Sequence, residues 1–227
     1  MNNTQFGGLT QKSKNQVPAA SEAIKSSSKP VVSYSGTQQN ELLAALPRTD
    51  LEDMFDHLEL VPMPFGKELF EYGSKLEYVY FPTTAIVSLL YVMEDGATTE
   101  IAVVGHEGAV GVSLFMGERA TCSAVVQSAG YGYRLKTQYL RDAFNRGGAL
   151  PQLLMRYTNA LFAQMAQNAV GGRHSSIEQK LCRWLLDRLD RSASNELKVT
   201  QELISIMLGV RRESITAAAG KLQDEGL

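Results

Sequence analysis

The spacing of hydrophobic and polar positions changes from a strand pattern to a helical one in the second half of the chain. Over residues 58–140, short segments rich in Val, Tyr, Phe, Leu and Thr recur between turn signals. The clearest pair is AIVSLLYVM and TTEIAVV, which flank Glu94-Asp95-Gly96. Because Asp-Gly tolerates the positive φ angles of a tight turn, this pair is predicted to form a β-hairpin. Many short strands of this kind favour a jelly roll or barrel.

The residues before the strands predict a tail and two short helices. Residues 1–40 are rich in Asn, Gln, Ser, Thr, Gly and Lys. Their hydrophobic residues follow neither the strand nor the helical spacing, so this segment is expected to be disordered. Short helices are predicted at 41–46 and 49–57, where Thr49 or Asp50 can cap the first turn. We therefore assign the β-roll domain to residues 41–148.

A long helix is predicted over residues 149–172, ending at a hinge formed by Gly171-Gly172. It carries two hydrophobic stripes, Leu150, Leu153, Leu154, Tyr157, Leu161 and Met165 on one face and Met155, Phe162, Ala166 and Ala169 on another. One stripe can pack on the β-domain and leave the other for a second copy of the helix. Burial between two domains of one chain fits the pattern equally. We assign the dimer contact to Leu154, Tyr157 and Leu161.

The C-terminal residues 173–227 predict three helices, the last two arranged as a helix-turn-helix. The first is expected to open with a capping box in which Ser175 is the cap and Glu178 reaches back. Two short helices follow, at Gln201 to Leu208, capped by Thr200, and at Arg211 to about Glu225. Only Gly209-Val210 separates them, and a glycine between two short helices is typical of a helix-turn-helix.

The exposed face of the last helix has the chemistry of a DNA-reading surface. Arg can donate two hydrogen bonds to guanine, Glu can accept one from cytosine, and Ser, Thr and Lys can hold phosphates. The candidate DNA-binding residues are Arg211, Arg212, Glu213, Ser214, Thr216, Lys221 and Thr200. An αα-hairpin with a solvated charged face is the alternative for this segment alone.

Composition and motifs narrow the function further. Lys plus Arg number 22 against 24 Asp plus Glu, so any contact with nucleic acid has to be concentrated on a local patch. Two cysteines, no hydrophobic run long enough to span a membrane and no signal peptide predict a cytoplasmic protein without a membrane partner. Because nucleophile-elbow, zinc-protease and phosphate-loop motifs are missing, an enzyme is not expected, and neither is a metal or cofactor.

A β-roll, a long helix and a C-terminal helix-turn-helix, in that order, resemble the Crp/Fnr family of bacterial transcription regulators. The most specific segment is TQELISIMLGVRRESITAAAGKLQDEGL, and FEYGSKLEYVYFP, DGATTEIAVVGHEGAVG and HSSIEQKLCRWLL are also similar to family segments. The resemblance implies an α+β fold with an N-terminal β-roll (jelly-roll) sensor domain, a dimerisation helix and a winged-helix-type DNA-binding domain. It implies a homodimer that binds near-palindromic double-stranded DNA, with RNA polymerase as a further partner. The family continues into a wing where this sequence stops at Leu227, so either the sequence is a fragment or the protein lacks the wing.

The resemblance also assigns roles to single residues. Arg212 and Glu213 match the pair that reads bases in the family, and Ser214 matches a residue that contacts the DNA backbone. Ala217 departs from the family, because cyclic-AMP receptors have a second arginine there, so a different operator is expected. The alternative function is a β-roll signalling or effector-binding scaffold whose helix-turn-helix no longer binds DNA.

The effector of the β-roll is not evident from the sequence. Nucleotide-binding family members neutralise the cyclic phosphate with an Arg that precedes a Ser, and the alignment places Cys122 at that Arg and Ser123 at the Ser. Cyclic nucleotides are therefore expected to bind weakly or not at all. The weak candidate pocket consists of Gly105, Glu107, Gly108, Arg119, Cys122 and Ser123.

Overall fold

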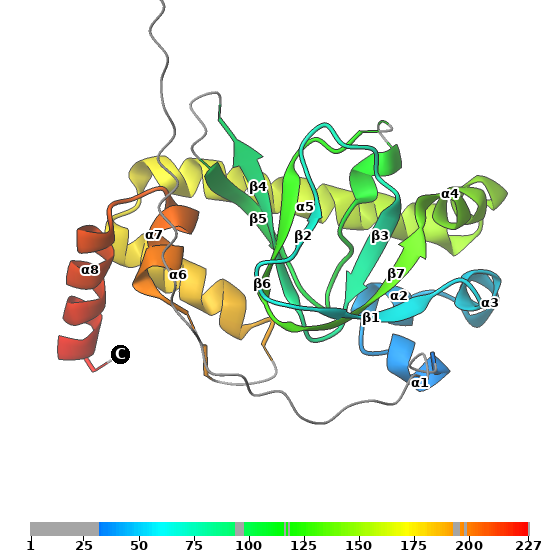
Figure 1. Cartoon of the computed structure of the whole chain (residues 1–227), viewed down its shortest axis with the longest axis horizontal. Helices are drawn as coiled ribbons and strands as arrows, with labels where there is room; N and C mark the ends of the chain where they lie inside the picture. Colours follow the sequence, from blue (N-terminus) through cyan, green and yellow to red (C-terminus); the bar gives the residue numbers. More distant parts are fainter. Residues whose placement is uncertain are drawn as a thin grey trace, which may run out of the picture.

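The computed structural model describes residues 32–93, 98–115, 117, 119–192, 196–197 and 199–226. In these ranges, seven strands form two antiparallel sheets: β1 (Glu59–Met63), β2 (Glu68–Phe70), β3 (Tyr78–Pro82), β4 (Ile86–Val92), β5 (Thr98–Val104), β6 (Ser123–Ser128) and β7 (Gly130–Lys136). One sheet has the order β1-β7-β3 and the other β2-β6-β4-β5. The two sheets face each other as a β-roll (Figure 1), so the predicted jelly-roll fold is confirmed.

The predicted hairpin is also confirmed, because β4 and β5 pair from Val87 opposite Val104 to Val92 opposite Thr98. Its turn, residues 94–97, lies outside the described residues. The strands form because β-branched and aromatic side chains meet between neighbouring strands. In β3, for example, Phe81 is completely buried and pairs with Tyr133 of β7.

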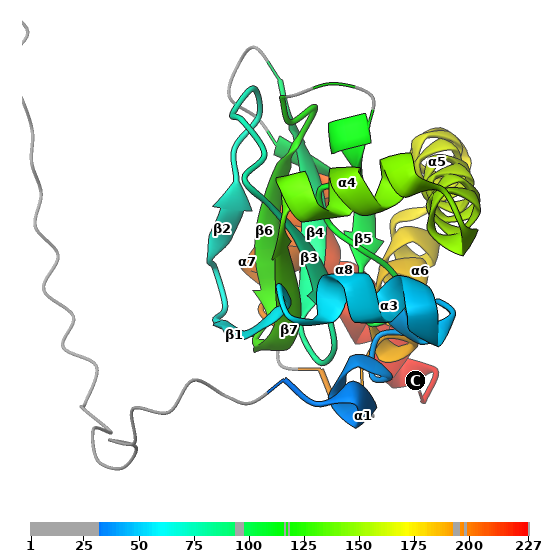
Figure 2. The ribbon, with the colours of Figure 1, turned by 90° about the vertical axis from the view of Figure 1, so that its right-hand side faces the viewer.

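Helices lie at both ends and along one side of the roll (Figure 1). They are α1 (Tyr34–Thr37), α2 (Glu41–Ala44), α3 (Arg48–Phe55), the 3-10 helix η1 (Val112–Phe115), α4 (Thr137–Arg146), α5 (Ala149–His174), α6 (Ile177–Leu189), α7 (Gln201–Leu208) and α8 (Arg212–Asp224). The long α5 runs along the roll and continues past it to the bundle of α6, α7 and α8 (Figures 1 and 2). None of the helices in the described ranges is long and apolar enough to cross a membrane.

The disordered tail predicted for residues 1–40 ends too late in the sequence. Residues 34–37 form α1, and both Thr37 and Asn40 are completely buried. The Asn40 amide donates to the carbonyl oxygens of Pro82 and Gly108, each at 2.8 Å, and its Oδ1 accepts from the Leu43 amide. A polar residue with all three bonds made inside the protein is ordered although it lies in a polar stretch. Residues 1–31 lie outside the described residues.

The predicted helices need correction in four places. Helix α4, between the roll and α5, was not predicted. Helix α5 does not end at Gly171-Gly172 but continues to His174. The capping box lies one residue later than expected, because Ser176 accepts from the Gln179 amide while the Gln179 side chain accepts from the Ser176 amide. Neither Thr49 nor Asp50 caps α3, whose N-cap is Pro47, and Asp50 instead accepts from the Ala149 amide at 2.9 Å and so caps α5.

Candidate nucleic-acid interface and sensor cavity

The helix-turn-helix is built from α7, a one-glycine turn and α8. The Thr200 hydroxyl accepts from the Leu203 amide at 3.1 Å and caps α7. Gly209 ends α7 in the left-handed conformation, with φ of 62°, which favours glycine. The helix pair packs on α6 through a buried cluster that contains Trp184, Ile204 and Ile215. Packing and turn chemistry therefore act together to hold α8 in place.

The first turn of α8 faces solvent. Arg211, Arg212 and Glu213 are exposed, and Ser214 is half-buried. Figure 1 shows α8 at the end of the molecule, with its length open on the side away from the roll. An Arg-Arg-Glu sequence at the amino end of an exposed helix can reach both phosphates and base edges.

Two other predicted DNA-binding residues already have partners inside the protein. The Thr216 hydroxyl donates to Oε1 of Gln201 at 2.8 Å and so links α8 to α7. The Lys221 ammonium donates to Oε1 of Glu178 at 2.6 Å. This bond raises the pKa of Lys221 and lowers the pKa of Glu178 to about 2. The pairing with Glu178 was not predicted, because 43 residues separate the two in sequence.

The residues assigned to the dimer contact pack inside the protein instead. Leu154 is 1% exposed and belongs to the core of the roll. The Tyr157 hydroxyl donates to the carbonyl oxygen of Ala109 at 2.9 Å, and burial raises its pKa. Leu161 packs against both core clusters of the roll. The assignment is therefore wrong. The sequence predicts two stripes, and the stripe assigned to the dimer contact is the one that packs on the β-roll.

The opposite face of α5 leaves a regular stripe uncovered. Met155 is 60% exposed and Phe162 is 55% exposed. Together with three further exposed residues they form the outer stripe, which consists of Met155, Asn159, Phe162, Ala166 and Ala169. The intervals are four, three, four and three residues, which is the heptad spacing of a coiled-coil seam.

Most of the candidate effector residues do not face a common pocket. The Glu107 carboxylate accepts from the Gly105 amide at 3.1 Å and from Nε of Arg191 at 2.7 Å, so it is turned toward α6. A Cβ on Gly108 would lie 2.4 Å from the Tyr157 hydroxyl. This glycine is therefore needed for the close approach of α5, and the Gly105–Gly108 turn is not a ligand cradle.

The remaining effector candidates divide between the rim and the interior of the roll. Arg119 is exposed, and its Nη1 donates to the carbonyl oxygen of Gly73 at 2.7 Å. The Ser123 hydroxyl accepts from the Tyr72 amide at 3.0 Å. Cys122 alone of the six predicted residues lines a cavity between the roll and α5.

That cavity has a volume of about 280 Å³. Its wall consists of Phe70, Leu89, Ile101, Ala109, Gly111, Val112, Ser113, Thr121, Cys122, Thr158, Leu161, Phe162 and Met165. These residues come from β2, β4, β5, η1 and α5 and from the loops that precede η1 and β6. In the described ranges, no group of three or more His, Cys, Asp or Glu side chains is arranged to hold a metal ion.

Two domain families match the chain in sequence. Residues 61–146 match the cyclic nucleotide-binding domain, and residues 179–227 match the Crp-like helix-turn-helix domain. They stand on either side of α5, in the order in which the β-roll and the helix-turn-helix occur in the fold. The chain belongs to the Crp/Fnr family of transcriptional regulators. It is a DNA-binding regulator, as the sequence resemblance implies.

Solved structures of other Crp/Fnr regulators have the same fold. FixK2 from Bradyrhizobium japonicum has a TM-score of 0.66 and 18% identity, over 74% of this chain and 86% of that one. CLP from Xanthomonas campestris, described as a c-di-GMP responsive global regulator, has a TM-score of 0.63 and 17% identity, over 80% and 94%. A putative Crp/Fnr regulator from Eubacterium rectale has a TM-score of 0.66 and 15% identity, over 84% and 89%. In sequence, no curated protein matches the chain.

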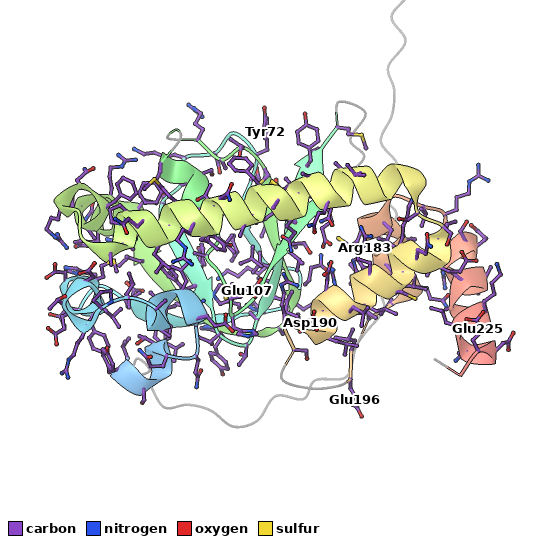
Figure 3. The ribbon with its side chains drawn as sticks, turned by 180° about the vertical axis from the view of Figure 1, so that it is seen from behind. Tyr72, Glu107, Arg183, Asp190, Glu196 and Glu225 are labelled. Atoms are coloured by element: carbon purple, nitrogen blue, oxygen red, sulfur yellow. The ribbon has the colours of Figure 1, made fainter. Side chains whose placement is uncertain are left out.

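In this Crp/Fnr regulator, two Glu–Arg pairs that sequence reasoning missed join the β-roll to the DNA-binding domain. Arg188 of α6 donates to the Glu100 carboxylate of β5, and both side chains are almost completely buried. Arg191, two residues beyond α6, pairs with Glu107 at 2.7 Å, and this pair is partly exposed. Figure 3 labels Glu107 and Asp190 close to the place where the roll meets the end of α6. No sequence signal was available, because each pair joins residues more than 80 positions apart.

Proposed function

We propose that two copies of this Crp/Fnr regulator pair through α5 and read a near-palindromic DNA site, one half-site for each α8. The β-roll controls the orientation of the DNA-binding domain. RNA polymerase is the further partner proposed from the family likeness, and no enzymatic activity is proposed. The observation that carries the proposal is the exposed Arg211-Arg212-Glu213 sequence at the start of α8, on a helix held by a buried cluster.

The chemistry of α8 supports a division of roles among its residues. Arg212 and Glu213 lie in the first turn and are exposed, so they can reach base edges in the major groove. Arg211, at the N-cap, is placed to neutralise a phosphate. Ser214 and Thr200 are proposed to contribute hydroxyl groups, while Thr216 and Lys221 contact DNA only if they exchange their partners Gln201 and Glu178.

The dimer contact is proposed at the outer stripe of α5. Its heptad spacing brings the same residues of two parallel helices face to face, and a two-fold axis then repeats the contact. Ala166 and Ala169 are small, so the two helices can approach closely there, while Met155 and Phe162 fill the space toward the roll end. This arrangement sets two copies of α8 on one side of the dimer, as a two-fold repeated site requires.

The buried Glu100–Arg188 pair is the proposed coupling between the β-roll and the DNA-binding domain. The Ser88 hydroxyl also donates to the Glu100 carboxylate, and the Arg188 guanidinium lies 3.8 Å from the centre of the Trp184 ring. Burial raises the pKa of Glu100 and lowers the pKa of Arg188, while the attraction between the two charges acts in the opposite direction on each. Such a pair contributes little net stability but fixes one geometry strongly, since each charge is costly without the other.

The test of the proposed function is selection of bound sequences from random double-stranded DNA by the full chain. A regulator that binds as a dimer enriches a two-fold repeat with half-site centres about one helical turn, roughly 34 Å, apart. The matched control is the Arg212→Ala variant, which should bind without enriching a sequence. An unenriched wild-type pool would contradict the proposal and favour the scaffold function in which the helix-turn-helix no longer binds DNA.

A further inference from the structure

The cavity between the β-roll and α5 lies where an effector can act on the dimer helix. Leu161, Phe162 and Met165 of α5 form one wall, and the inner faces of β2, β4 and β5 form the other. Phe162 belongs to the outer stripe as well as to the cavity wall. A molecule in this cavity therefore touches the helix that carries the proposed dimer contact.

The wall carries no charge. Every residue that lines the cavity in the described part of the chain is hydrophobic, a glycine, a hydroxyl residue or a thiol. Burial raises the pKa of the Cys122 thiol to about 11, so this group is neutral at physiological pH. The Thr158 hydroxyl donates to the Leu154 carbonyl at 2.8 Å, so its proton is already used within the helix. A charged ligand would enter this space without a compensating partner.

Arg119, the cation nearest to Cys122 in sequence, does not line the cavity. Arg119 lies at the exposed rim, bound to the Gly73 carbonyl, and does not contribute to the wall. A buried phosphate would therefore lack the neutralising guanidinium that the Arg-Ser pair supplies in nucleotide-binding family members. The electrostatics of the cavity and its volume point to the same class of molecule.

The volume is large enough for a substituted benzene ring. An apolar cavity of about 150 Å³ holds a benzene molecule, and pockets for drug-sized ligands begin at about 300 Å³. The cavity here measures about 280 Å³. We propose that it binds a small, uncharged, largely apolar effector about the size of a substituted benzene ring, with at most one or two hydroxyl groups facing Ser113 and Thr121. Its role as an effector rests on the proposed function.

Three fluorinated benzene derivatives test the proposal on the full chain: the neutral fluorobenzene and 4-fluorophenol and the anionic 4-fluorobenzoate. Their binding is followed by fluorine NMR at pH 7. The two neutral probes should bind with dissociation constants below about 1 mM. The anionic benzoate should bind on the order of 100-fold more weakly, because its charge is not compensated. Equal binding of the anion, or no binding of either neutral probe, would overturn the proposal, as would tighter binding of cyclic AMP.

Variants at Thr158 place the probe in the cavity. Thr158→Phe fills the space and should abolish binding of both neutral probes, whereas Thr158→Val keeps the volume and should retain it. Folding of both variants is followed by their thermal unfolding. Binding that persists in a folded Thr158→Phe protein would overturn the location of the site.

A further variant tests the charge of the wall instead of its volume. Cys122→Arg adds a cation to the wall and should narrow the gap in affinity between 4-fluorophenol and 4-fluorobenzoate. An unchanged gap would show that position 122 does not face the ligand. DNA selection by the ligand-free chain is read separately, so a failed cavity and a failed DNA-binding proposal give different results.

Discussion

The DNA-binding domain and the β-roll use their charged residues in opposite ways. In the DNA-binding domain, Arg211, Arg212 and Glu213 stand exposed on the first turn of α8. In the β-roll, the cavity wall is uncharged, while Glu100 and Glu107 are turned away from it toward α6. One region therefore presents charge to an external partner, and the other uses charge to hold its neighbour.

This difference separates recognition from control. A charged surface open to water can bind the phosphates of DNA with high affinity and release counterions. A neutral cavity discriminates between ligands by their shape and charge. A molecule bound there can change DNA binding only by shifting the elements that contact the DNA-binding domain. The Glu–Arg pairs and α5 are among the contacts that join the roll to the helices around α8. Leu90 of β4, in the cluster that holds Trp184, Ile204 and Ile215, is another.

The largest expected effect comes from removing the dimer that places two copies of α8 together. Ala166→Asp puts a charge in the middle of the outer stripe and should yield monomers. Affinity for a two-fold repeated site should fall by about 10² to 10⁴, because the second half-site no longer binds intramolecularly. Sedimentation and DNA titration measure the two effects. The control is Gln167→Asp, an exposed neighbour outside the stripe, and loss of the dimer in this control as well would argue against the stripe.

The second prediction breaks the connection between the two regions. Arg188→Met leaves the Glu100 carboxylate buried without its partner and should destabilise the protein by about 3–5 kcal/mol in chemical denaturation. The double variant Glu100→Leu with Arg188→Met removes both charges and should recover most of this loss. If the double variant is as unstable as the single one, the pair is not the coupling proposed here.

The third prediction separates base reading from phosphate binding on α8. Arg212→Ala should cost about 1–3 kcal/mol of discrimination between the selected site and random DNA. Arg211→Ala should instead weaken both DNAs alike and reduce the salt dependence of binding. Competition titrations at several salt concentrations measure both quantities. Equal losses from the two variants would remove the distinction.

The smallest expected effect concerns the ion pair that holds α8 on α6. The pKa of Glu178 is lowered to about 2 by its bond to Lys221, so the pair stabilises the fold fully above the ordinary Glu pKa of about 4.3. This contribution is lost as the pH falls toward 2. Wild type should therefore be slightly more stable than Glu178→Gln at pH 7, and the difference should shrink below pH 4. A difference that does not change with pH would have another origin.

Local sequence patterns predicted the elements that depend on neighbouring residues. The hairpin of β4 and β5, the glycine turn at Gly209 and the Thr200 cap follow from residues a few positions apart. The order of domains was also recognisable, because the helix-turn-helix segment is specific. The Ser176 cap was misplaced by one residue, since two adjacent serines offer the same chemistry and only packing selects between them.

By itself, the sequence determined the fold class, the family and the exposed charge of α8, because each depends on local periodicity or on a contiguous motif. Only the tertiary structure decided which stripe of α5 is buried, where Glu100 and Glu107 point and what lines the cavity. Two hydrophobic stripes on one helix are equivalent until a sheet covers one of them. Partners such as Glu100 and Arg188 are 88 residues apart. Local sequence patterns cannot predict such a contact, because only the folding of the whole chain brings the two residues together.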